Sequence, residues 1–285
     1  MKQNKLLRIG QVALLLLLTG IAVFPLLWAI ASSLRPDTEI YQYALPFQWH
    51  TFVPVEFTFD AYVKVFRDFK FHRPLFNTLI VSVVTVLLSC VLNSLAAFGF
   101  TFFDFKGKKF LFALTLVSFM VPFESIAISL YKVINRLDWV DTYQGLIIPT
   151  IADGLVLFLF VQFFVGVPKS LFEAARIDGA NWGQVYFRIL IPVSKPVFIT
   201  AGLMTFINQW NSFMWPLLVA HGKEMRLVQV ALSDFTAEHV TLWSCLYAAS
   251  VISAIFPLLL FLPFQKYYVQ GIASSGIKGL SLIHI

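Results

Sequence analysis

The stretch VALLLLLTGIAVFPLLWAI, residues 12–30, decides the fold class, because it is apolar on every side and carries no charge. An α-helix needs about 20 apolar residues to cross a hydrocarbon core of about 30 Å, and this run has that length. A strand of a membrane barrel would instead alternate apolar and polar residues over about ten positions. The stretch therefore predicts a membrane-spanning helix and an all-α membrane protein.

The rest of the chain repeats this pattern. Of the 285 residues, 59% are hydrophobic and only 13% are charged, which is far from the composition of a soluble domain. Five further apolar runs of similar length follow the first, and two of them contain a single acidic residue. We predict one transmembrane domain over residues 1–285 with six transmembrane helices, at about residues 12–33, 76–102, 110–131, 145–167, 196–220 and 242–264.

Basic residues in the loops indicate the orientation, because positive charge is retained on the cytoplasmic side of a membrane. With the N-terminus inside, the inner segments carry 12 of the 21 Lys and Arg residues against three acidic residues. The outer segments carry the other nine basic residues and 10 of the 15 acidic ones. We expect both termini in the cytoplasm. The first apolar run is longer than the roughly 7–15 residues of a signal peptide, so an uncleaved first span is expected.

Composition also argues against several functions. The net charge is +6, but the basic residues are scattered and form no patch with interleaved aromatic residues, so we expect no nucleic-acid partner. Cys90 and Cys245 both fall in apolar spans, the five histidines are dispersed, and no metal site or catalytic cluster is expected. No G-x-x-x-x-G-K-[ST] motif is present to bind ATP phosphates. The chain is therefore predicted not to be an enzyme.

A polar stretch at residues 168–192, between the fourth and fifth spans, has the marks of a helix, a turn and a second helix. Ser170 and Glu173 have the spacing of a capping box, which predicts a helix that begins at Leu171. Gly179 is placed to end that helix in the left-handed conformation. Asn181 with Gln184 repeats the start signal for a second helix. Pro192 is expected to break or kink that helix.

The same stretch resembles the EAA loop of integral membrane permease subunits of binding-protein-dependent ABC importers. The matching residues are Glu173, Ala174, Ala175, Gly179, Ile189 and Pro192, and one departure is Ile191 where the family usually has leucine. Four more segments resemble the carbohydrate subfamily, and specifically the maltose-type second permease, over nearly the whole chain. They lie at residues 76–100, 120–149, 206–219 and 266–279.

The resemblance implies a function and a set of partners. The chain would be the transmembrane subunit of an ATP-driven importer of a sugar or oligosaccharide in a bacterial inner membrane. It would pair with a homologous second permease, a cytoplasmic ABC ATPase dimer and an extracytoplasmic binding protein. ATP and Mg would bind to the ATPase and no cofactor to this chain. A neighbouring subfamily that carries polyols or glycerol phosphate is an open alternative.

In this family the EAA loop is the coupling helix, which sits in a cleft of the ATPase. The resemblance implies that Glu173 meets a basic group there, while Ala174, Ala175 and Gly179 permit close approach. Taken from the residues alone, the loop is equally consistent with a folded surface loop. We call residues 168–192 the coupling loop.

Polar residues within the spans are candidates for the substrate path, because ionisable groups in a bilayer are costly and often functional. Amides, acids and aromatic faces together suit a carbohydrate, and the candidates are Glu124, Asp153, Asn208, Trp210 and Asn211. The alternative is that these groups satisfy backbone freed near Pro122, Pro149 and Pro216 or bond across helices. A helical stripe of Ser89, Asn93 and either Ala96 or Ala97 is favoured as a packing seam over a sugar contact.

Two further interpretations concern the acids and the outer loop. Glu124 and Asp153 would form the relay of an ion-coupled secondary transporter, although no internal inverted repeat supports that alternative. The long outer segment at residues 33–74 contains a short amphipathic helix near Tyr62. That helix either lies on the outer membrane surface or packs on the ends of the spans.

Overall fold

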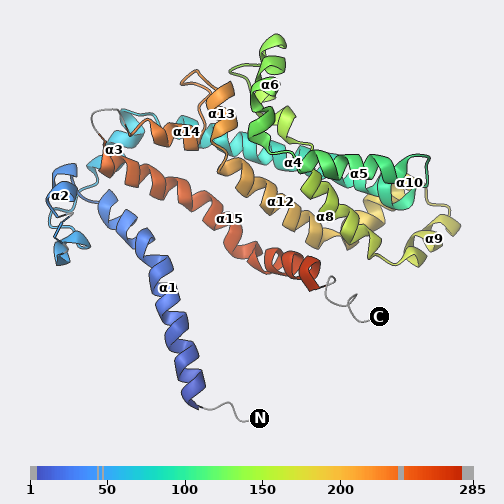
Figure 1. The fold of residues 1–285 in the computed structure, drawn as a ribbon, viewed down its shortest axis with the longest axis horizontal. Helices are drawn as coiled ribbons and strands as arrows, with labels where there is room; N and C mark the ends of the chain where they lie inside the picture. Colours follow the sequence, from blue (N-terminus) through green and yellow to red (C-terminus); the bar gives the residue numbers. More distant parts are fainter. Residues whose placement is uncertain (1–4, 44, 47, 237–240, 278–285) are drawn as a thin grey trace. The chain divides into compact units, whose positions relative to one another are not determined.

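The computed structural model describes residues 5–43, 45–46, 48–236 and 241–277, and the side chains of residues 8–266 within those ranges. This part of the chain is helical, with no strand and one isolated bridge between Thr236 and Thr241 (Figure 1). The predicted all-α class is confirmed for these residues. The C-terminal tail GLSLIHI lies outside the described residues.

The chain divides into two compact units, residues 1–72 with 231–255 and residues 73–230 with 256–285. The first unit contains α1 (Lys5–Ser33), α2 (Asp37–Gln42), the 3-10 helix η1 (Trp49–Thr51), α3 (Asp60–Arg67) and the first part of α15 (Trp243–Ile277). Its elements are joined by Asp37, whose carboxylate accepts hydrogen bonds from the backbone N–H and hydroxyl of Ser244 at 2.8 and 3.0 Å. Helix α3 buries Ala61 and Val65 and leaves Phe66 exposed.

The second unit contains most of the helices. They are α4 (His72–Phe102), α5 (Lys108–Phe119), α6 (Phe123–Arg136), α7 (Tyr143–Ile147), η2 (Ile148–Thr150), α8 (Gly154–Val165), α9 (Lys169–Ile177), α10 (Trp182–Gln184), the π-helix η3 (Val185–Leu190), α11 (Ile191–Val193), α12 (Lys195–Trp210), α13 (Met214–Val219) and the rest of α15. Helix α14 (Val228–Ser233) crosses the boundary between the units. In Figure 1, α8 lies beside α5 and α12, and α13 lies beside α6 and α7.

Three helices are long and apolar enough to cross a membrane by themselves: Arg8–Ser33 of α1, His72–Phe102 in α4 and Trp243–Lys266 of α15. They cover the predicted spans at 12–33, 76–102 and 242–264. Three more candidate spans are bent pairs, which meet at 98° for α5 with α6, 45° for α7–η2 with α8, and 78° for residues 182–193 with α12. Up to six spans are therefore present in the described part of the chain.

The bends arise where the sequence interrupts the helical hydrogen bonds. Pro122 is the N-cap of α6, so the chain cannot continue straight from α5. Pro149 lies in η2, and the third bend falls at Ser194, between α11 and α12. Helix α12 itself ends at Trp210, before a short break that precedes α13. The predicted runs at 110–131, 145–167 and 196–220 are thus each interrupted in the structure.

The break before α8 is satisfied by side chains of α4. The Nδ2 atom of Asn93 donates to the carbonyl oxygen of Ile151 at 2.9 Å, and its Oδ1 accepts from the N–H of Asp153 at 3.4 Å. Ser89, Asn93 and Ala97 are all buried, which agrees with their interpretation as a packing seam. The seam is close-packed because α4 presents small side chains there.

Candidate functional site

The first helix of the coupling loop, α9, begins at Lys169 with Pro168 as its N-cap, and no side chain caps it. The capping box predicted for Ser170 and Glu173, with a helix start at Leu171, is therefore wrong. The helix begins before Ser170, so this serine lies inside the first turn, where its side chain cannot act as the N-cap. Proline fixes the backbone angle before the helix and takes over the role of the start signal.

The end of α9 agrees with the prediction for Gly179. This residue has a φ angle of +85°, in the left-handed region. The N–H of Ala180 donates to the carbonyl of Ala175 at 2.9 Å, and the N–H of Gly179 donates to that of Arg176 at 3.1 Å. These two bonds make a Schellman motif, which closes a helix and reverses the chain.

The second helix starts as predicted. Asn181 Oδ1 accepts from the N–H of Gln184, and Gln184 Oε1 accepts from the N–H of Asn181, each at 2.9 Å. The helix then widens into the π-helix η3 and does not break at Pro192, which lies in α11. A wider π turn relieves the clash between a proline ring and the preceding turn. The break falls at Ser194, before α12 begins.

Aromatic side chains anchor the coupling loop to the end of α4. Phe172 is buried and its ring lies 4.5 Å from the ring of Phe102. The ring of Trp182 lies 4.9 Å from that of Phe103. Aromatic pairs of this kind add about 0.5–1.5 kcal/mol to the burial of their area. Together these contacts fix α9 and α10 against one end of a long membrane helix.

The other face of α9 is open. Glu173, Ala174 and Gly179 are exposed, and a Cβ placed on Gly179 would meet nothing within 4 Å. Ile177 is 85% exposed although it is apolar. Ala175 is half-buried against the hydrophobic core of the second unit. The arrangement is a short helix, anchored on one face, that presents Glu173 and the apolar side chains of Leu171 and Ile177.

The two acids proposed for the substrate path both lie at helix starts that follow a break. Asp153 is the N-cap of α8, and its Oδ1 accepts from the N–H groups of Leu155 and Val156 at 2.8 and 3.2 Å. Glu124 is exposed in the first turn of α6, where a negative charge is favoured by the helix dipole. Asp153 therefore has a capping role, as the alternative interpretation of these residues expected.

The remaining path candidates lie at the end of α12. Trp210 is 1% exposed, with its ring 5.4 Å from that of Phe206 and 5.2 Å from that of Phe256, both nearly parallel to it. Its faces are thus occupied by protein. Asn208 and Asn211 are exposed, and the Nδ2 of Asn211 donates to the carbonyl of Ile207 at 2.9 Å.

Two functional features were not predicted from the sequence. Gln209, mentioned only as a neighbour of Trp210, is buried and its Nε2 donates to the hydroxyls of Thr85 at 3.1 Å and Thr150 at 2.8 Å. It thereby joins α12 to α4 and to the bend before α8. Ser94 and Tyr186 form another such link. Amides and hydroxyls within apolar runs are the signal that points to such bonds, but their pairing depends on how the helices pack.

Comparison with known proteins identifies the family. A family model described as "Binding-protein-dependent transport system inner membrane component" matches residues 89–273, which include the coupling loop and every candidate path residue. The arabinooligosaccharides transport system permease protein AraQ of Halalkalibacterium halodurans is 33% identical over 91% of this chain and 92% of its own. The trehalose/maltose transport system permease protein MalG of Thermococcus litoralis is 34% identical over 98% of this chain and 100% of its own.

A solved structure shares the fold. The crystal structure of a bacterial ABC transporter involved in the import of the acidic polysaccharide alginate contains a chain with a TM-score of 0.82. The match covers 94% of this chain and 98% of that chain at 22% sequence identity. At this identity the likeness supports the fold and not the substrate.

Proposed function

The chain belongs to the binding-protein-dependent transport system inner membrane component family, and from this we propose that it imports a sugar or oligosaccharide as one permease subunit of an ATP-driven complex. The family assignment makes it a membrane protein of a transport system. The sugar class is supported by the names of the relatives, which carry arabinooligosaccharides and trehalose or maltose.

The proposed topology has six spans in one transmembrane domain, with both termini in the cytoplasm. The bent pairs α5 with α6 and α7–η2 with α8 would each serve as one span, and α12 with α13 as another, next to α1, α4 and α15. The excess of basic residues in the predicted inner segments supports this orientation. The coupling loop then lies on the cytoplasmic side.

The observation that carries the proposal is the pairing of an open face and an anchored face on α9. Glu173 and Ile177 are exposed, while Phe172 on the same helix packs on Phe102 of α4. A partner that binds the open face and moves would displace α9, and the aromatic contacts would carry that displacement to α4. Residues 182–193 lead directly into α12, which gives a second connection to the spans.

We propose that the partner on this face is a separate ATPase dimer, which binds ATP and Mg. Glu173 would pair with a basic group of the ATPase, and Ala174, Ala175 and Gly179 would keep the approach close. A homologous second permease would complete the path, and an extracytoplasmic binding protein would deliver the sugar. Closure of the ATPase on ATP would move the coupling loops together and open the path outward.

We propose that Glu124, Asn208 and Asn211 contact the sugar, since all three are exposed and carry hydrogen-bonding groups. Asp153 and Trp210 would stabilise the wall of the same path. Asp153 caps α8, and the ring of Trp210 at the end of α12 stacks with the rings of Phe206 and Phe256. The ion-coupled alternative is not favoured, because the carboxylate of Asp153 is engaged by two amides of α8.

The proposal is tested by purifying the tagged chain from its native membrane and identifying the proteins that accompany it. We expect an ATPase and a second permease with the wild type, and loss of the ATPase with Glu173→Lys and Gly179→Asp. The matched control is Gly107→Asp, because Gly107 has a φ angle of +84° and equally open surroundings but lies outside the coupling loop. Its backbone strain is the same, so it is expected to retain the ATPase.

If Gly107→Asp loses the ATPase as completely as Gly179→Asp, the loss comes from backbone strain and not from the proposed contact. If the wild type purifies without any ATPase and the variants behave like it, the coupling proposal is wrong. If the wild type purifies with the ATPase and a binding protein, that binding protein is screened with maltose, trehalose, arabinooligosaccharides and glycerol phosphate to test the substrate class.

A further inference from the structure

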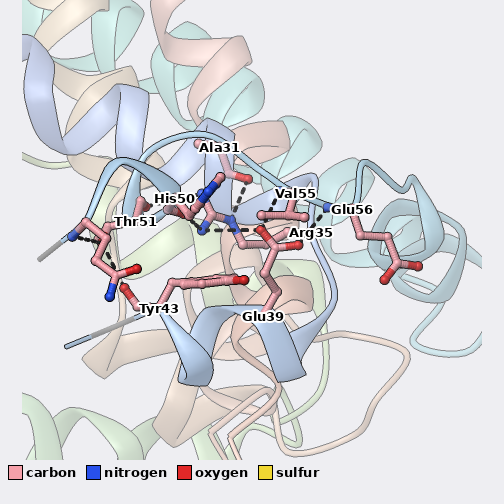
Figure 2. Close-up of polar contacts among 9 residues, drawn as sticks. Ala31, Arg35, Glu39, Tyr43, His50, Thr51, Val55 and Glu56 are labelled. Carbon is pink, nitrogen blue, oxygen red and sulfur yellow. Dashed lines mark hydrogen bonds and ion pairs between the residues drawn. The ribbon is translucent and has the colours of Figure 1, made fainter. Parts of the chain in front are cut away.

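The segment at residues 48–59 of the first unit is irregular, yet it is tied to the end of α1 by buried charges. The side chains of Arg35 and Glu39 are 2% and 6% exposed, and Nη1 of Arg35 lies 3.8 Å from Oε1 of Glu39. Figure 2 shows that both side chains point toward this segment, and both are buried. We call residues 48–59 the apolar flap.

The two charged groups satisfy backbone groups of the flap. Arg35 donates from Nη1 to the carbonyl of His50 at 3.0 Å and from Nη2 to that of Thr51 at 3.2 Å. The carboxylate of Glu39 accepts from the N–H of Val55 at 2.7 Å and of Glu56 at 2.9 Å (Figure 2). Burial lowers the pKa of Arg35, and the charge of Glu39 opposes this shift. These bonds supply what a regular helix would otherwise provide to the backbone.

Three more hydrogen bonds hold the flap in place within the first unit. The hydroxyl of Thr51 donates to the carbonyl of Tyr43 at 2.9 Å and accepts from the N–H of Gln48 at the same distance. The N–H of Thr58 donates to the carbonyl of Leu34 at 2.9 Å. The flap is therefore held at its start, centre and end.

Ring contacts place the flap alongside the spanning helix α1. Phe52 lies 5.5 Å from the ring of Phe24 and 5.7 Å from that of Trp28. Phe24 and Trp28 precede the end of α1 at Ser33 by nine and five residues, which corresponds to about 13 and 8 Å along the helix. The flap thus folds back beside a part of α1 that belongs to the span.

Most of the exposed side chains of the flap are apolar, and Gln48, His50 and Glu56 are exposed beside them. Trp49 is 73% exposed, and Val53, Val55, Phe57 and Phe59 are also exposed. The surface of α1 is apolar and exposed as well, because no residue in its most apolar 18-residue stretch is buried in the structure. The two apolar surfaces are continuous through the Phe52 contacts. Trp49 of the flap is of the residue type enriched at membrane interfaces.

We propose that the apolar flap is embedded in the bilayer leaflet that holds the end of α1, as a monotopic element beside the span. Irregular backbone is excluded from lipid unless its polar groups are satisfied within the protein. The Arg35–Glu39 pair meets this requirement for four backbone groups of the flap. The exposed valine and aromatic side chains then contact lipid, while the charges of Arg35 and Glu39 stay buried and Glu56 faces the headgroups.

Spin labels test this placement in the assembled complex in proteoliposomes. The native cysteines are replaced as Cys90→Ser and Cys245→Ala, and labels are placed by Trp49→Cys, Val55→Cys or Phe57→Cys. Leu16→Cys on α1 is the lipid control and Lys223→Cys, on an exposed loop position, is the water control. Collision with oxygen reports lipid, and collision with a nickel chelate reports water.

We expect the flap labels to prefer oxygen over nickel by a ratio close to that of the Leu16 site and at least several-fold above that of the Lys223 site. Ratios like that of the Lys223 site would show a flap in water and overturn the proposal. Labels that neither reagent reaches would show that another protein covers the flap, and would overturn it equally.

A second variant tests the role of the ion pair. In the Val55→Cys background, Arg35→Gln is expected to release the flap and to raise the nickel accessibility of the label several-fold, while the Leu16 label stays in lipid. An unchanged label would contradict the role of Arg35. If the Arg35 variant does not assemble, the labels in the native background still decide where the flap lies.

Discussion

The Oγ atom of Ser94 lies 2.6 Å from the phenolic oxygen of Tyr186, and this buried hydrogen bond joins α4 to the π-helical turn of the coupling loop. The ring of Tyr186 also packs 5.3 Å from that of Phe98. Movement of the loop is therefore transmitted to α4 through a polar bond as well as through aromatic contacts. This link connects the loop to a span through one pair of side-chain oxygen atoms.

Tyr186→Phe removes this hydrogen bond and keeps the ring. We expect a loss of about 0.5–1.5 kcal/mol in the stability of the complex, because a buried hydrogen bond contributes that amount. A double-mutant cycle with Ser94→Ala, followed by thermal unfolding in detergent, measures the coupling. Additive effects of the two substitutions would contradict a direct interaction.

Gly154→Ala tests the close packing of α5 on α8. A Cβ at this position would lie 2.6 Å from the Cβ of Phe119, so the helices must separate. We expect a loss of about 1–3 kcal/mol, the usual cost of overpacking. The control is Gly202→Ala in α12, where the nearest atom would be 3.5 Å away, and which should be neutral or slightly stabilising. Equal effects at both glycines would refute the packing argument.

Asp153→Asn distinguishes a capping residue from a proton relay. Asparagine keeps the oxygen that accepts from the N–H groups of Leu155 and Val156 but cannot titrate. We expect sugar uptake close to wild type and unaffected by a protonophore, whereas Asp153→Ala should cost about 1 kcal/mol of stability. Loss of uptake in an intact Asp153→Asn complex would mean that the charge itself is required.

Asn93→Ala should disturb the bend before α8. It removes the donor to the carbonyl of Ile151 and the acceptor for the N–H of Asp153, and leaves both near the protein interior without those partners. We expect a loss of about 2 kcal/mol in stability, since an unsatisfied buried group costs roughly 1–3 kcal/mol. Asn93→Asp, which keeps only the acceptor, should be intermediate or worse. Wild-type melting of Asn93→Ala would show that the break is satisfied in another way.

Asn208→Ala tests direct contact with the sugar. Because its side chain is exposed, we expect an unchanged melting temperature and a rise of about 3–10-fold in the substrate concentration for half-maximal uptake, the equivalent of one hydrogen bond. Ser129→Ala, also exposed, serves as the control. An unaltered concentration dependence would remove Asn208 from the path.

Much of the fold follows from the sequence because lipid imposes a simple rule on it. The charge-free run at residues 12–30 and its counterparts require helices, and the described residues are helical as expected. The bends were harder to predict. Pro122 was identified as a place where backbone is freed, but the 98° angle between α5 and α6 depends on what packs around it. Average hydropathy cannot distinguish a straight span from two bent pieces.

The candidate site was predicted unevenly for a similar reason. Gly179 and the Asn181–Gln184 box depend on neighbouring residues, and local chemistry was enough to predict them. The start of α9 was misplaced because Pro168 competes with Ser170 for the same role. Arg35 and Glu39 gave no local signal for these contacts, because all four loop partners lie 15–17 residues further along the chain and only folding brings them together.

The most direct test of the account is ATP-driven uptake of labelled sugar into proteoliposomes that contain the whole complex and its binding protein. The account predicts that Gly179→Asp abolishes uptake and the stimulation of ATP hydrolysis by the loaded binding protein, while Gly107→Asp, with the same backbone strain, retains both. Uptake that persists with Gly179→Asp, in a complex that still hydrolyses ATP on demand, would contradict the claim that α9 couples this permease to its ATPase.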